Sequence, residues 1–116
     1  MDCHHHLDGL YETEHGAVYR CRQCDWFNVF FGPIILSNSR AGFDQLHALI
    51  DSLEPELDPA HHAFGRRYHL HTANHQFGLA FTQAEIDELR ELLDGAVAMD
   101  ELDRLLDDAL RPSDDS

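Results

Sequence analysis

The sequence predicts an α+β fold in which an antiparallel sheet of β-hairpins carries helices on one side. Two segments of β-forming residues each lead into an amphipathic helix, an offset of 43 positions relates these two segments, and a cysteine pair at knuckle spacing precedes them. Because 116 residues is the usual size of one domain, we expect a single domain over 1–111. Its expected parts are a metal-knuckle arm with the first strands (1–30), a first half (31–54), a second half (66–96), a C-terminal helix (99–110) and, beyond the domain, a frayed tail (112–116).

The first hairpin–helix unit begins with apolar and aromatic residues, turns at a Gly-Pro pair and continues as an amphipathic helix after a serine. Its expected elements are strands over 26–31 and 34–38 and a helix over 40–53. Ser39 stands directly before the helix, where a hydroxyl side chain satisfies backbone N–H groups that have no helical partner.

The second hairpin–helix unit repeats this order. Its expected elements are strands over 67–73 and 76–81, a turn at Asn74-His75 and a helix over 83–95. Thr82 and Glu85 have the spacing of a capping box, in which each side chain binds a backbone N–H of the other residue. If the 43-residue offset reflects an internal duplication, the two halves pack about a pseudo-twofold axis, in one shared sheet or in two.

Other segments flank the two units. They are a strand over 15–21, a connector over 55–65 that contains two prolines, and an extra helix over 99–110. The aromatic strand over 26–31 is apolar on both faces except at Asn28, and such a strand needs cover on both sides. Either the chain's own helices cover it, or a second copy does through this strand or through the last helix. The candidate interface residues are Trp26, Phe27, Phe30 and Phe31.

Cysteines and histidines near the N-terminus have the spacing of a structural zinc site. Cys21 and Cys24 form a C-x2-C pair between two expected strands, and Cys3 lies 18 positions before Cys21 with three histidines directly after it. Zinc in structural sites takes four Cys or His ligands in tetrahedral geometry. We therefore expect one structural Zn²⁺ per chain, bound by Cys3, Cys21, Cys24 and either His5 or His6. It would fasten an N-terminal arm of roughly 15 polar residues that is otherwise loose.

The C-x2-C pair has two other interpretations, namely free thiols in a reducing compartment and a redox dithiol. A redox pair usually lies at a helix N-terminus, where the helix dipole lowers the thiol pKa. Here the residues after Cys24 are expected to form a strand, which favours the zinc site.

A second group of histidines lies on the second hairpin. His69 and His71 share one face of their strand, and His75 lies in the turn that follows. Either they bind a second metal, as in a metal-dependent enzyme or a metal-handling protein, or they form a polar face without a metal. The motifs HExxH, GxSxG, GxGxxG and GxxxxGK[ST] do not occur in the sequence. The lack of these catalytic motifs in the sequence favours a role without catalysis.

Charge limits the partners that the chain can have. It contains 22 acidic residues, eight arginines and no lysine, for a net charge of −14. Nucleic acids and anionic membrane surfaces bind through basic residues, so neither is an expected partner. A protein partner or self-association is expected instead. The sequence shows no signal-peptide pattern and no long apolar run, so we expect a cytoplasmic protein.

Four short motifs follow one another through residues 3–95. They are Cys3-His-His-His, Cys21-x2-Cys24 after Gly-Ala-Val-Tyr, the strand Phe-Asn-Val-Phe-Phe-Gly, and the helix start Phe81-Thr82-x2-Glu85. In this layout the chain resembles a small family of uncharacterised proteins from Bacteroidota, a domain of unknown function. The resemblance implies a compact domain with a metal knuckle and implies no activity. The expected function is a non-catalytic zinc-binding module that acts through protein–protein contacts.

Overall fold

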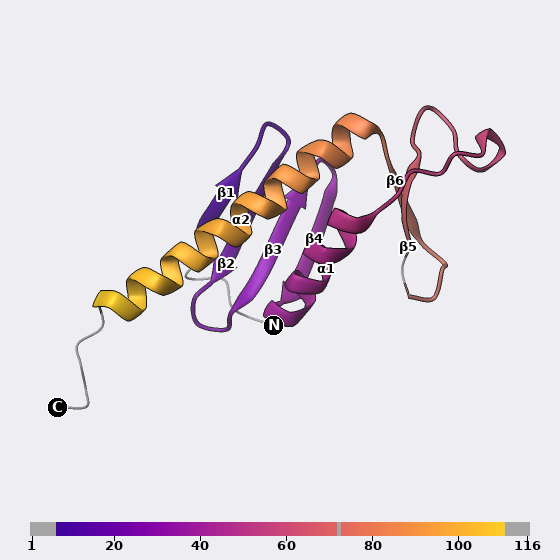
Figure 1. The fold of residues 1–116 in the computed structure, drawn as a ribbon. Coiled ribbons are helices and arrows are strands. Elements are labelled where there is room, and N and C mark those ends of the chain that lie inside the picture. The colour runs from indigo at the N-terminus through magenta and orange to yellow at the C-terminus, as the bar shows by residue number, and fades with distance from the viewer. Residues whose placement is uncertain (1–6, 72, 111–116) are drawn as a thin grey trace.

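The computed structural model describes residues 7–71 and 73–110 and has a mixed α+β fold (Figure 1). The described elements are β1 (Leu7–Glu12), β2 (Gly16–Cys21), β3 (Trp26–Phe31), β4 (Ile34–Ser39), α1 (Arg40–Ser52), a short 3-10 turn (Pro59–His61), β5 (Tyr68–His71), β6 (Gly78–Phe81) and α2 (Gln83–Leu110). The first four strands form one antiparallel sheet in the order β1-β2-β3-β4, and β5 pairs with β6 in a separate sheet. The predicted fold class is thereby confirmed.

The hydrophobic core lies between the four-stranded sheet and the two α-helices. Figure 1 shows α1 and α2 across the same face of the sheet, and the two helices also contact each other. Strand residues alternate between the faces of a sheet, so Val18, Phe27 and Val29 point toward the helices and are fully buried. Phe27 stacks on Phe43 of α1 with ring centroids 4.5 Å apart. The predicted placement of helices on one side of the sheet is correct.

The same alternation divides the four candidate interface residues of β3. Phe27 and Phe31 are 0% and 7% exposed and belong to the core, so their assignment to an interface was wrong. Trp26 and Phe30 occupy the opposite face, which neither helix covers (Figure 1). Both faces of this strand are apolar except at Asn28, which shares the face of Trp26 and Phe30 and is the one residue in the strand that indicates which face is exposed.

The order hairpin–helix occurs twice, as β3–β4–α1 and as β5–β6–α2. Both helix starts have the predicted caps. The Ser39 hydroxyl accepts a hydrogen bond from the backbone N–H of Gly42 (3.1 Å). Thr82 and Glu85 make the reciprocal bonds of a capping box, at 2.9 and 3.1 Å. The two hairpins lie in different sheets, and an internal duplication stays a prediction.

The structure differs from the prediction along α2. Two helices were expected, over 83–95 and 99–110, but α2 is one continuous helix of 28 residues. Gly95 stands where the first of these helices was expected to end, and its role is steric: a Cβ atom there would lie 2.5 Å from the ring of Tyr11. The glycine therefore permits close packing of β1 against the helix, and the helix continues through it.

β1 is the element that the sequence analysis missed. Its segment contains few apolar residues, of which Leu10 is buried in the core. It pairs with β2 along its length, with an irregularity in register between Gly9 and Tyr11. The chain from Leu7 onward is thus held by the sheet itself, whereas we had expected a loose arm that depends on zinc.

The C-terminal part of α2 extends beyond the sheet (Figure 1). The described part of the chain covers its leucines only in part, and Leu105 and Leu110 are 65% and 78% exposed. Neither α1 nor α2 is long and apolar enough to cross a membrane. Cys3, His5, His6 and the tail over 112–116 lie outside the described residues.

Candidate functional site

The two described cysteines flank the turn between β2 and β3. Cys21 ends β2 and is a free thiol with no exposed surface, whereas Cys24 is engaged in a disulfide. The backbone N–H of Asp25 donates to the carbonyl of Cys21 (2.9 Å), and Asp25 has a left-handed backbone with φ of 57°. These features bring the C-x2-C pair into one tight turn, which is the donor arrangement that a zinc knuckle requires.

The remaining predicted zinc ligands, Cys3 with His5 or His6, lie outside the described residues. Within 7–71 and 73–110, no group of three or more His, Cys, Asp or Glu side chains is arranged to hold a metal ion. Of the predicted zinc ligands, the structure therefore describes only Cys21 and Cys24. The chemistry of this pair fits zinc when both sulfurs are reduced, since thiolates are the ligands.

A network of charged residues lies beside the cysteine turn. Arg40, at the start of α1, donates two hydrogen bonds to the carboxylate of Asp25, at 2.6 and 2.9 Å. Arg40 also donates to one oxygen of Asp100 on α2 (2.7 Å), and Arg20 of β2 donates to the other (2.5 Å). These bonds connect the cysteine turn, β2 and both helices at one end of the molecule.

The charges in this network shift the pKa values of its members. Burial by itself raises the pKa of Asp100, but hydrogen bonds and charge from Arg40 and Arg20 outweigh burial and hold the pKa below its usual value. Hydrogen bonds to Asp25 and Asp100 raise the pKa of Arg40. Asp100 is therefore ionised over the whole neutral range and acts as a fixed anion between two cations.

The sequence analysis missed this network, although one signal was present. Asp100 follows Leu93 and Ala96 at helical spacing, so an acidic residue occupies the apolar stripe of α2. A carboxylate on a buried stripe requires a cationic partner. Its partners Arg20 and Arg40 are 80 and 60 positions away in the sequence, and no local pattern identifies them.

A second polar cluster fastens the loop between β1 and β2 to α2. Glu88 accepts hydrogen bonds from the Thr13 hydroxyl and from the backbone N–H of His15, both at 2.7 Å, and lies 2.8 Å from Nδ1 of His15. The hydrogen bond and charge of Glu88 raise the pKa of His15. Burial raises the pKa of Glu88, but the hydrogen bonds from Thr13 and His15 outweigh this effect and lower it overall. These interactions position elements of the fold.

The histidines of the second hairpin lie near one another, as predicted. Ring centroids are 6.3 Å apart for His69 and His71 and 5.8 Å apart for His71 and His75. Nε2 of His69 is 2.9 Å from the carbonyl of Arg66, which commits that nitrogen as a donor. The three rings do not form a metal-binding group in the described part of the chain.

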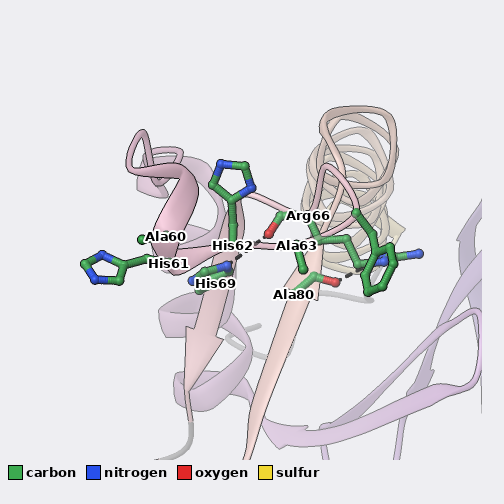
Figure 2. Close-up of a pocket in the computed structure, with 8 residues that line it drawn as sticks. Ala60, His61, His62, Ala63, Arg66, His69 and Ala80 are labelled. Carbon is green, nitrogen blue, oxygen red and sulfur yellow. Dashed lines mark hydrogen bonds between the residues drawn. The ribbon is translucent and has the colours of Figure 1, made fainter.

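A shallow pocket of about 480 Å³ contains further histidines, His61, His62 and His69 (Figure 2). Figure 2 shows the three rings pointing in different directions, with the ring of His61 turned away from the other two. Alanine side chains, Phe64 and Arg66 line the rest of the pocket. Because the ring nitrogens do not converge, the pocket lacks the donor geometry of a metal or acid–base site.

The face of the sheet opposite the helices carries large apolar and aromatic side chains, together with the hydrogen-bonded pair Asn28 and Ser37. Tyr19 of β2 and Phe30 of β3 meet edge to face with centroids 5.8 Å apart, and each is more than a third exposed. Ile35 of β4 pairs with Phe30 across the ladder and is 63% exposed. Trp26 lies on the same face next to the cysteine turn. We call this surface, formed by Tyr19, Trp26, Phe30 and Ile35, the open face.

Fold and site together define a small α+β domain with a cysteine turn at one end, a charged network that fastens it, and an open apolar sheet face. The chain belongs to the family described as a family of unknown function (DUF6686), whose profile matches residues 2–108. The resemblance to an uncharacterised family is confirmed in that form. No curated protein and no solved structure matches the chain.

Proposed function

We propose that this protein is a non-catalytic binding module that contacts another protein through the open face. The observation that carries this proposal is the exposure of large apolar side chains on a sheet face that neither α1 nor α2 covers. Contiguous apolar patches of this kind on soluble domains mark interaction sites. Tyr and Trp contribute strongly to such contacts because they offer large contact areas at low entropic cost.

The distribution of charge supports the same role. No Asp, Glu, Lys or Arg occurs from residue 26 to residue 39, although these residue types make up 26% of the chain. This stretch forms β3 and β4, which supply most of the open face. A partner can therefore cover the face without burying an unpaired charge, which is the main electrostatic cost of association.

The ionisable groups with shifted pKa values stabilise the fold. Asp100 and Arg40 connect α1, α2 and the cysteine turn, and Glu88 fastens a loop to α2. His15, Glu85 and Glu88 line a pocket of about 510 Å³, but their hydrogen bonds connect them to one another and to Thr13, Arg66 and Thr82. An acid–base mechanism needs such groups to be free to exchange a proton with a substrate in the cleft. This assignment of roles favours binding over catalysis.

We propose further that the module carries one structural Zn²⁺, held by Cys21 and Cys24 together with Cys3 and either His5 or His6. Cys21 pairs with Trp26 and Leu7 in the two ladders, so these three residues share one row of the sheet. A metal there would fix the turn at the end of the open face and secure the residues before β1. The site requires a reducing compartment such as the cytoplasm, in which Cys24 is a thiolate.

Metal analysis tests the zinc proposal. Native protein purified without added metal or chelator should contain one zinc per chain, and the double variant Cys21→Ser, Cys24→Ser should contain none. The double variant His69→Ala, His71→Ala is the matched control and should keep its zinc. Native protein without zinc, or loss of zinc in the histidine variant alone, contradicts the assignment.

Site-specific crosslinking tests the binding role. A photo-crosslinking benzoylphenylalanine in place of Phe30 should give one discrete adduct in cells, and the adduct should disappear on adding Tyr19→Ser and Ile35→Ser. The same group in place of Leu105, which is exposed on the distant part of α2, is the control. Equal adducts from both positions, or none from Phe30, would mean that the open face is not a binding surface.

A further inference from the structure

The two edges of the four-stranded sheet differ in their protection against pairing with another strand. β1 has charged Asp8 and Glu12 and an irregular register between Gly9 and Tyr11. Charges and bulges of this kind prevent an edge from pairing with other chains. β1 is thus a protected edge.

β4 is the other edge, and it has neither charged residues nor an irregular register. All six of its residues, from Ile34 to Ser39, pair with β3 in unbroken register, and none is charged. β3 is its only partner in the described sheets, so its outer side offers backbone groups for a further strand. An unbroken, uncharged and partly apolar edge is the kind that accepts an added strand.

A groove of about 460 Å³ runs beside this edge, between β4 and the β5–β6 hairpin. Its apolar lining is Ile34, Ile35, Leu36, Leu70, Phe77 and Leu79. Its size lies within the range of pockets that hold ligands. No ladder joins the hairpin to β4 among the described strands, so the groove has a strand edge as one wall and apolar side chains as the other.

Charge defines what the groove can hold. Both walls come from segments without Asp, Glu, Lys or Arg, residues 26–39 and 68–84, in a chain of net charge −14. His71 is the one ionisable side chain in the lining, so a charged side chain entering the groove would find no Asp, Glu, Lys or Arg partner there and would lose its hydration. A second copy of the chain would bring its own net charge of −14 to the contact. The lining therefore favours a single extended segment that is uncharged and apolar.

We propose that the free edge of β4 binds an extended, uncharged segment of a partner polypeptide as a fifth strand of the sheet. This inference rests on the proposed binding function and names the form of the partner. The backbone of the segment pairs with β4, and its alternate side chains point to opposite faces of the sheet. One set of side chains enlarges the open face beside Ile35, and the other lies toward the helix side.

A designed peptide tests this proposal on the full-length protein. The probe is a dye-labelled heptapeptide of alternating threonine and isoleucine, with blocked ends, measured by fluorescence anisotropy. Two further versions have N-methyl groups on alternate backbone nitrogens, one on the odd and one on the even positions. Strand addition uses the N–H groups of one parity, so one methylated version should bind like the parent and the other at least about tenfold more weakly.

A matched pair of variants locates the peptide. Ile35 and Leu105 are exposed to nearly the same extent, 63% and 65%. Ile35→Lys places a charge beside the β4 edge and should weaken binding at least about tenfold, whereas Leu105→Lys should leave it unchanged.

Several results would overturn strand addition. They are no binding of the parent peptide at about 1 mM, equal affinity of the two methylated versions, or equal effects of the two lysine variants. If the crosslink from Phe30 persists in that case, the binding function stands and only the form of the partner is wrong. A dimer in sedimentation velocity that Ile35→Lys dissociates would instead identify a second copy as the occupant.

Discussion

Asp100→Asn is the substitution whose effect the structure specifies best. The Asp100 carboxylate accepts hydrogen bonds from Arg20 on one oxygen and from Arg40 on both, and only 5% of the residue is exposed. The amide has one acceptor oxygen, so a guanidinium N–H of Arg20 or Arg40 would face an N–H₂ group and lose its hydrogen bond. The side chain of Arg20 is itself 6% exposed and cannot recover that bond from water.

The expected cost follows from these contacts. A hydrogen bond to a charged group contributes about 1.5–3 kcal/mol, and removing one partner of a buried ion pair costs about 3–5 kcal/mol. We therefore expect Asp100→Asn to lower the free energy of unfolding by about 3 kcal/mol or more, against a usual total of about 5–15 kcal/mol. Urea denaturation followed by circular dichroism measures this as a lower midpoint at unchanged slope.

Asp25→Asn is the matched control, because Asp25 also binds Arg40 but its side chain is 49% exposed. Solvent screens this pair, so we expect a loss below about 1 kcal/mol. The reasoning is refuted if the two variants cost the same, or if Asp100→Asn changes stability by less than about 1 kcal/mol. In the wild type, the contribution of Asp100 should be present above its unfolded-state pKa and should be lost as the pH falls through its lower folded-state pKa.

Two further predictions concern the contacts of α2. The His15–Glu88 pair needs protonated His15, so its contribution should be complete below the unfolded-state pKa of 6.5 and be lost as the pH rises through the higher folded-state pKa. Thermal melting across this range should show that dependence in the wild type and lack it in Glu88→Gln. Gly95→Ala should cost about 1–3 kcal/mol because the new methyl group meets the ring of Tyr11. In a double-mutant cycle, Tyr11→Ala should remove most of that cost, and an additive result would contradict the steric explanation.

The sequence predicted only part of the candidate site. The spacing of Cys21 and Cys24 indicated a knuckle, and the structure places both at one turn. All four residues of β3 were candidates for an interface; Phe27 and Phe31 lie in the core, and an interface role for Trp26 and Phe30 stays a prediction. The groove beside β4 was not predicted, since it forms between segments that are far apart in the chain.

The sequence by itself determined the elements whose signals are local. The Gly32-Pro33 turn, the Ser39 cap and the Thr82–Glu85 capping box depend on interactions within a few residues, so their positions could be found by inspection. Tertiary structure alone decided the rest. β1 exists as a strand because β2 pairs with it, and α2 runs through Gly95 because the chain packs closely there. The partners of Asp100 and the exposure of one sheet face likewise depend on contacts between distant segments, which no local pattern encodes.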